Sequence, residues 1–328
     1  MPDEPTNRRG FLRAFVRSAG EALVEATGAV KAEMDEPEAA APSAAPDPAP
    51  RTHAAPLTQA PPVVRSLTVE EVLDLATEEG LAHRAEALRG LARAGTRLTP
   101  AGGDDPARSW IGRPAATAGT DGTAAAVADI DLADPALAGG PLPGGGRLRV
   151  QVIVPRRAPI GRCSRAHVAV DPAAASARVE ARPVALSTEM MLPRVWAAPV
   201  AALMFVEAEQ AAYFRLRDRV ADLQGVPVED GDAEGVARHH LLGYPTETSG
   251  TMPLECELAS RGLDLDTELH RVPPEVVAAS ERWRLLLQLT QDERGGVVLG
   301  PGAERLYFWI TQDGLDRQDF SEVWAIAR

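Results

Sequence analysis

The sequence predicts an α+β domain built mainly on antiparallel sheet with covering helices, together with a tethered helix at the N-terminus. Two observations lead to this prediction. Strand-like segments follow one another without a regular βαβ alternation, which is typical of α+β proteins. An Ala/Pro-rich stretch separates the first residues from the rest. We therefore expect an amphipathic helix at 1–33, a disordered linker at 34–64 and the α+β domain at 65–328.

The first 33 residues have the spacing of an amphipathic helix. Phe11 and Phe15 belong to an apolar strip, and Arg9, Arg13 and Arg17 form a basic stripe beside it, one turn apart. Such a helix docks either in a groove of a protein partner or, as a peripheral contact, on an anionic membrane surface. Packing on its own domain is the alternative, and periodicity alone does not choose among these.

Arg8-Arg9 followed by Phe11-Leu12 looks like a twin-arginine export signal. A signal of that kind needs an uninterrupted apolar segment after the arginines, whereas here charged residues such as Arg17 and Glu21 interrupt it. We interpret the match as chance and expect a cytoplasmic protein. Residues 34–64 hold almost no large apolar side chains, so they cannot offset the entropy cost of ordering.

The domain is expected to start with helices and to continue with strands. Thr68 and Glu71 form a capping box, which predicts a helical hairpin that ends near Gly95. Residues 98–125 have the composition of a loop. A long helix is expected at 199–223, followed by a polar loop. The predicted strands are 126–130, 147–154, 166–170, 178–186, 283–289, 305–310 and 323–326.

The large aromatic side chains gather near the C-terminus, although aromatic residues make up only 4% of the chain. Along 305–310, Leu306 and Phe308 alternate with Tyr307 and Trp309, so both faces of this strand are apolar. A strand of this kind is central and covered on each side. We therefore expect Trp283 and Phe308 in the core, while a ring-lined cleft is the alternative interpretation.

Composition excludes several classes of function. A net charge of −13 argues against a nucleic-acid binder, which needs a basic surface. The two cysteines, Cys163 and Cys256, form no CxxC pair and so predict neither a disulfide framework nor a zinc site. No apolar run is long enough for a membrane span. Motifs for nucleotide loops, hydrolase elbows and metalloproteases are absent as well, so we expect no cofactor and no metal.

Several passages resemble the YwqG-like family, a bacterial domain of unknown function (number 1963). They are His239-His240-Leu241-Leu242-Gly243-Tyr244-Pro245, Trp283-Arg284-Leu285-Leu286-Leu287-Gln288-Leu289, Arg305-Leu306-Tyr307-Phe308-Trp309-Ile310 and Asp319-Phe320-Ser321-Glu322-Val323-Trp324. The resemblance runs from about Leu98 to Arg328. It implies a compact α+β protein of the bacterial cytoplasm, often encoded near toxin and immunity genes and without an established reaction.

The chain departs from the family pattern at two loops. Leu299-Gly300-Pro301 stands where the family usually has Trp-Gly-Asp, and Thr248-Ser249-Gly250 follows the Leu-Gly-Tyr-Pro motif where a glutamine is usual. A polar family site at those loops would be altered in this member.

The sequence indicates a non-enzymatic interaction protein of the immunity or adaptor type. Its acidic domain would bind a protein partner of cationic character. The alternative is a small-molecule-binding or hydrolytic enzyme with a cleft near the Leu-Gly-Tyr-Pro motif, where the candidate binding residues are His240, Tyr244, Arg284 and Gln288. For the adjacent histidines, the competing interpretation is one surface histidine and one packed, hydrogen-bonded histidine.

Overall fold

The computed structural model describes residues 65–101, 109–112, 124–154, 163–171, 181–195, 197–226, 238–246, 251–263, 272–292 and 303–328, and the single residues 265, 297 and 299. All of them belong to one compact unit, Val63–Asp266 with Val272–Arg328. The predicted N-terminal helix, with Arg9, Arg13, Arg17, Phe11 and Phe15, and the predicted linker lie outside the described residues.

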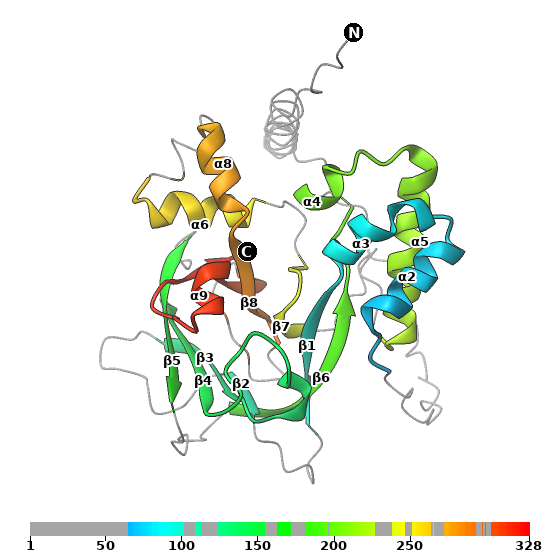
Figure 1. The fold of residues 1–328 in the computed structure, drawn as a ribbon. Coiled ribbons are helices and arrows are strands. Elements are labelled where there is room, and N and C mark those ends of the chain that lie inside the picture. The colour runs from blue at the N-terminus through cyan, green and yellow to red at the C-terminus, as the bar shows by residue number, and fades with distance from the viewer. Residues whose placement is uncertain are drawn as a thin grey trace, which may run out of the picture. The chain divides into compact units, whose positions relative to one another are not determined.

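Within the described residues, ten strands form one antiparallel sheet that closes into a barrel (Figure 1). The strands are β1 (Arg93–Pro100), β2 (Ser109–Gly112), β3 (Ala124–Asp131), β4 (Arg147–Val154), β5 (Ser164–Asp171), β6 (Ala181–Met191), β7 (His239–Leu242), β8 (Trp283–Thr290), β9 (Arg305–Thr311) and β10 (Val323–Ala327). Their order is β1-β6-β2-β3-β4-β5-β10-β9-β8-β7, and β7 closes the ring by pairing Arg97 of β1 with His240. The antiparallel α+β class is thus confirmed, but the sheet is closed, which leaves it without free edges.

Aliphatic side chains from the strands fill the barrel in one continuous cluster. In β9, Leu306, Phe308 and Ile310 belong to this cluster, whereas Tyr307 and Trp309 belong to another on the outer face. The prediction of a strand that is apolar on both faces is therefore confirmed. Trp283 and Phe308 are both buried, as expected.

Helices cover two parts of the outer surface. On one side, α6 (Met252–Ser260) packs on β8 and α8 (Pro274–Ser280), over the aromatic cluster of Trp283, Tyr307 and Trp309 (Figure 1). These two helices lie in sequence that we expected to be loop. A short helix, α9 (Gln312–Asp316), follows β9, and the 3-10 turn η3 (Pro135–Leu137) follows β3. No helix in the described ranges has the length and apolar character needed to cross a membrane.

On another side, α2 (Val69–Glu78), the 3-10 turn η1 (Ala82–Arg84), α3 (Ala85–Leu91), α4 (Ala198–Ala201) and α5 (Glu207–Leu223) enclose a second apolar cluster (Figure 1). The capping box is confirmed: Glu71 N–H donates to Thr68 Oγ1 over 3.2 Å, and Thr68 N–H donates to a Glu71 carboxylate oxygen over 2.8 Å.

Three element predictions are wrong. The helix expected at 199–223 is divided into α4 and α5, because Met204 has a φ of 50° between them and the Val206 N–H is capped by Glu209. The loop expected at 98–125 overlaps β1 and contains β2, and the helical hairpin ends at Leu91, before Gly95.

Candidate functional site: an arginine-lined pocket

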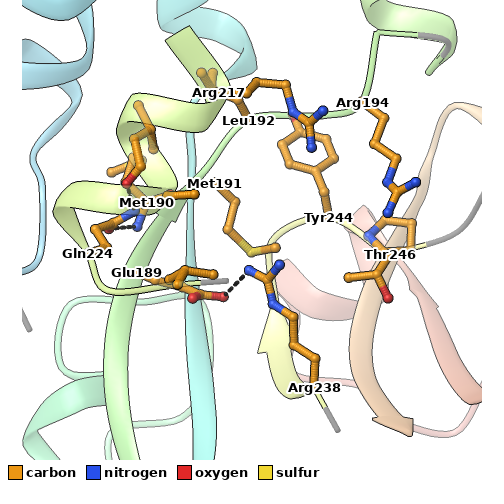
Figure 2. A pocket seen from close by; sticks show the side chains of 14 residues that line it. Glu189, Met190, Met191, Leu192, Arg194, Arg217, Gln224, Arg238, Tyr244 and Thr246 are labelled. Carbon is orange, nitrogen blue, oxygen red and sulfur yellow. Dashed lines mark hydrogen bonds and ion pairs between the residues drawn. The ribbon is translucent and has the colours of Figure 1, made fainter. Parts of the chain in front are cut away.

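A pocket lies beside the seam where the barrel closes (Figure 2). One wall comes from the end of β6 and from α5, and the other from the segment Arg238–Thr246, which contains β7. The polar side chains in the lining are those of Glu189, Arg194, Arg217, Gln224, Arg238, Tyr244 and Thr246. The volume is about 60 Å³. A water molecule needs about 10–15 Å³ on this measure, so the pocket has room for about four to six such groups.

Gln224 fixes the wall that β6 and α5 share. This side chain is buried, and its Oε1 accepts a hydrogen bond of 2.6 Å from the Met190 N–H. Its Nε2 donates to the carbonyl oxygens of Met190 and Val220, each over 2.9 Å. A single amide thus joins the C-terminal turn of α5 to the last residues of β6. The pocket wall is therefore held by hydrogen bonds inside the protein.

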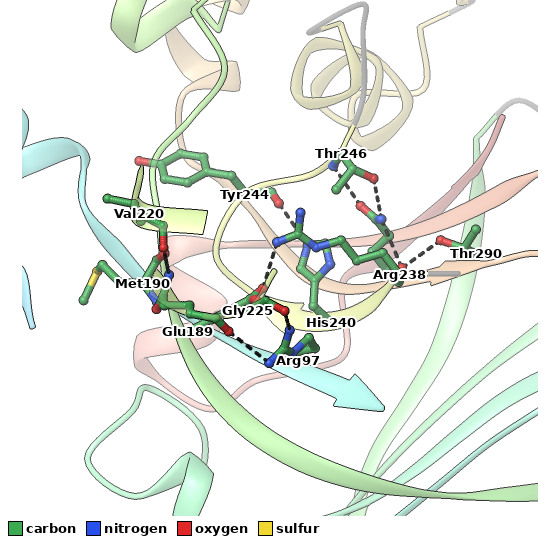
Figure 3. A network of polar contacts seen from close by, with 12 residues as sticks. Arg97, Glu189, Met190, Val220, Gly225, Arg238, His240, Tyr244, Thr246 and Thr290 are labelled. Atoms are coloured by element: carbon green, nitrogen blue, oxygen red, sulfur yellow. Dashed lines mark hydrogen bonds and ion pairs between the residues drawn. The ribbon is translucent and has the colours of Figure 1, made fainter. Parts of the chain in front are cut away.

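Gln288 fixes the opposite wall through its bonds to Thr246 and Arg238, which Figure 3 labels. Its Oε1 accepts from the Thr246 N–H over 2.9 Å, and its Nε2 donates to Thr246 Oγ1 over 2.5 Å and to the Arg238 carbonyl over 3.3 Å. Thr290 Oγ1 donates to the same carbonyl over 2.7 Å. Gln288 is a candidate binding residue in the alternative interpretation of the sequence, but this side chain is fully buried. It is a positioning residue for the two ends of the segment.

His240 shapes the turn of the Leu-Gly-Tyr-Pro motif from inside. It lies opposite Gln288 in the β7–β8 pair, and its Nε2 donates to the Tyr244 carbonyl over 2.9 Å. Leu242 and Gly243 in this turn have φ values of 60° and 70°. Both His239 and His240 are buried, so the expectation of one surface histidine is wrong.

Tyr244 is the one candidate from the sequence that lines the pocket. Its hydroxyl donates to the Leu91 carbonyl over 2.7 Å, and the Arg93 guanidinium lies 4.7 Å from the centre of its ring. Burial raises the pKa of the Tyr244 phenol, while Arg93 and Arg284 act in the opposite direction. The hydroxyl therefore stays protonated and keeps its hydrogen bond at neutral pH.

Arg284 lies near the pocket without lining it. Its Nε donates to Gln312 Oε1 over 2.8 Å. Burial lowers the pKa of Arg284 first, and the neighbouring Arg93 lowers it further. Even so, a guanidinium stays charged in proteins. Arg93 and Arg284 thus add positive charge beside Tyr244, which lines the pocket.

Glu189 and Arg217 each contribute to the pocket a buried polar atom that has no hydrogen-bond partner among the described residues. Arg238 Nη2 donates to Glu189 Oε1 over 3.2 Å, but the other carboxylate oxygen, Oε2, is buried and accepts nothing (Figure 2). Arg217 Nη1 is likewise buried without an acceptor. Leaving such a group unsatisfied costs about 1–3 kcal/mol or more when the group is charged. The pocket therefore contains a buried donor, on Arg217, and a buried acceptor, on Glu189, that a ligand with complementary groups would satisfy.

The chain matches one known family. Residues 168–327 match the sequence model of a domain of unknown function, DUF1963. The resemblance to the YwqG-like family is thereby confirmed. A search of curated proteins finds no match.

The DUF1963 match begins within β5, runs through β10 and includes every residue that lines the pocket. Strands β1 to β4 precede the matched region, yet they complete the same barrel. All residues that line the pocket thus lie within the region that matches the family, whereas the barrel also includes strands outside that region.

Sequence reasoning missed four charged residues of the pocket: Glu189, Arg194, Arg217 and Arg238. They are scattered over fifty residues and follow no motif. One signal was present, because Glu189 stands directly before the apolar run Met190-Met191-Leu192. A carboxylate in such a position is rarely buried without a specific partner. Among the described residues, no group of His, Cys, Asp or Glu side chains is arranged to hold a metal ion.

Proposed function

We propose that this DUF1963 domain binds a small anionic molecule in the arginine-lined pocket. The observation that carries the proposal is the buried Arg217 Nη1, a charged donor of the pocket lining that has no acceptor in the part of the chain that the structure describes. Arginine is the side chain best suited to carboxylate and phosphate, since its planar fork donates two parallel hydrogen bonds.

The charge around the pocket supports the same ligand. The lining holds the guanidinium groups of Arg194, Arg217 and Arg238 against the single carboxylate of Glu189, and Arg93 and Arg284 lie next to Tyr244. The whole chain carries −13, so this cluster opposes the overall sign. Concentrated positive charge in a hollow attracts small anions.

The pocket favours binding over hydrolysis. The described residues of its lining include no Ser, Cys or His side chain to act as nucleophile or base. The Thr246 hydroxyl accepts from Gln288, and the Tyr244 hydroxyl donates to the Leu91 carbonyl. The volume suits a small molecule, or the charged end of a larger one.

The interaction or adaptor role that the sequence suggests stays a prediction. The large apolar side chains exposed in the described part of the domain are Met204, Val206, Leu223 and Leu263. Single exposed apolar residues are ordinary on a protein surface. A small-ligand site is compatible with a protein partner elsewhere on the chain.

Calorimetric titration of the full-length protein with acetate, glycine and inorganic phosphate tests the proposal. We expect at least one of these to bind, and Arg217→Met to weaken that binding at least tenfold. Arg215→Met is the matched control. Arg215 lies on the same helix, but its Nε bonds Glu79 Oε2 over 2.8 Å and its side chain is exposed. This control should bind as the wild type does.

Two results would overturn the proposal. One is a wild-type protein that binds none of the three anions at low ionic strength. The other is an Arg217→Met variant that binds as tightly as the Arg215→Met control. In the absence of ligand, Arg217→Met should be at least as stable as the wild type, because it removes an unsatisfied buried donor.

A further inference from the structure

We infer that the ligand of this pocket is a zwitterion of amino-acid size, whose ammonium group binds Glu189 while its carboxylate binds the arginines. The inference rests on the proposed anion site and names the ligand class. It starts from Glu189, which is only 2% exposed. The carboxylate of this residue lies in the wall of a pocket that is otherwise suited to anions.

A buried carboxylate works against a purely anionic ligand. A like charge a few ångströms away disfavours binding, and the low local dielectric strengthens the repulsion. An all-arginine lining would bind a simple anion better. Glu189 therefore suits a ligand that also carries a hydrogen-bond donor, and it disfavours ligands that lack one.

Pairing with Arg238 does not account for the whole Glu189 side chain. The contact is a single hydrogen bond of 3.2 Å from Nη2 to Oε1. An arginine and a carboxylate that serve only each other commonly form two parallel bonds. Here Oε2 remains buried without a partner. An ammonium group has three donors and no acceptor, so it matches this oxygen.

The placement of the charges fits a short zwitterion. Figure 2 shows Glu189 and Arg238 near one end of the view, with Arg194 and Arg217 near the other. The pocket holds about four to six water-sized groups. Glycine has five heavy atoms and β-alanine has six, so a carboxylate, one or two carbons and an ammonium fill that space.

Titration of matched ligand pairs into the full-length protein tests the inference. The pairs are glycine with acetate and β-alanine with propionate, which differ only by the ammonium group. We expect wild-type protein to bind at least one amino compound at least tenfold more tightly than its partner acid. Glu189→Gln should reduce this preference to less than threefold while the acids still bind.

Glu79→Gln is the control variant, since the Glu79 carboxylate is also mostly buried but pairs with Arg215 and Arg219 away from the pocket. It should keep the preference of the wild type. Circular dichroism and thermal unfolding show whether Glu189→Gln folds. If it does not fold, the comparison of each amino compound with its partner acid on wild-type protein still tests the preference for a zwitterion.

Equal affinity for an acid and its amino counterpart would overturn the inference and leave the anion site standing. So would a preference that survives in Glu189→Gln. Failure of wild-type protein to bind any of the four compounds, or inorganic phosphate, would remove the anion site itself, and the inference with it.

Discussion

The adjacent rings of His239 and His240 are both buried, but they have different partners. His240 donates to the Tyr244 carbonyl, whereas the Nδ1 of His239 accepts from the Thr290 N–H over 3.2 Å. The His239 Nε2 lies 3.9 Å from an oxygen of Asp292. Burial lowers the pKa of His239 from 6.5 to about 4, and the Asp292 carboxylate opposes this only in part.

This pKa makes stability depend on pH. Between pH 6.5 and 4 the unfolded His239 binds a proton that the folded ring does not, so the free energy of unfolding should fall as the pH falls through this range. Above pH 6.5 the ring has no effect. A pKa shift of this size lowers the free energy of unfolding by about 3 kcal/mol in total once His239 is protonated. His239→Gln should flatten the slope, as measured by urea unfolding at pH 7, 6, 5 and 4.

His167→Gln serves as the control, because His167 is exposed on β5. Its pH dependence should match that of the wild type. A wild-type slope that persists unchanged in His239→Gln would show that carboxylates elsewhere cause the acid sensitivity.

At the scale of elements, local pattern predicted some strands well and others not at all. β4, β8, β9 and β10 lie within one residue of their predicted bounds, because their own apolar runs are buried on one or both faces. β1, with the sequence Arg-Ala-Gly-Thr-Arg-Leu-Thr-Pro, has few apolar residues and a glycine inside it. Its strand structure depends on pairing with β6 and β7, which lie far away in sequence.

Gly95 in β1 is needed for a contact that the sequence does not reveal. A Cβ at Gly95 would lie 2.6 Å from the Met191 sulfur, and one at Gly243 would lie 2.2 Å from the same atom. Met191 also lines the pocket. The two glycines thus let β1, the end of β6 and the turn after β7 approach one another where the barrel closes.

Substitution at these glycines should reveal the shared contact. Gly95→Ala should destabilise the protein by about 1–3 kcal/mol through overpacking. Combined with Met191→Ala, it should cost less than the sum of the single changes, because the new methyl group occupies space that the sulfur leaves. Met191→Ala should rescue Gly243→Ala less completely. The φ of 70° at Gly243 adds about 1–2 kcal/mol of strain for any residue with a Cβ, and the loss of the sulfur does not relieve that strain. Urea unfolding of the five variants measures these energies.

Gly90→Ala, in α3, is the matched control, because nothing lies within 4 Å of its Cβ position. It should be neutral, or stabilising by about 0.4–1 kcal/mol. Strict additivity of Gly95→Ala and Met191→Ala would refute the shared contact.

At the scale of the whole molecule, the sequence pointed to one residue of the candidate pocket, Tyr244, and missed its arginines. The Leu-Gly-Tyr-Pro motif is local, so Tyr244 and His240 could be found from it, whereas Arg194, Arg217 and Arg238 meet only because the chain returns to the barrel seam. The net charge of −13 gave no hint of a basic pocket, because a total charge does not locate individual groups. Likewise, closure of the sheet depends on one pairing, β1 with β7, between two strands that were not predicted.

The start of the folded unit yields the last prediction. The compact unit begins at Val63, and Leu67 is buried against the cluster of α2, α3 and α5. Thr68 caps α2. A chain of residues 63–328 should therefore keep the thermal midpoint of the full-length protein and its affinity for glycine. A chain that starts at Val69 lacks both Leu67 and the cap, whose loss alone costs about 0.5–2 kcal/mol, so its midpoint should fall by several degrees. Differential scanning calorimetry of the three chains measures the difference. A lowered midpoint already in the 63–328 chain would show that residues 1–62 contribute to the stability of the domain.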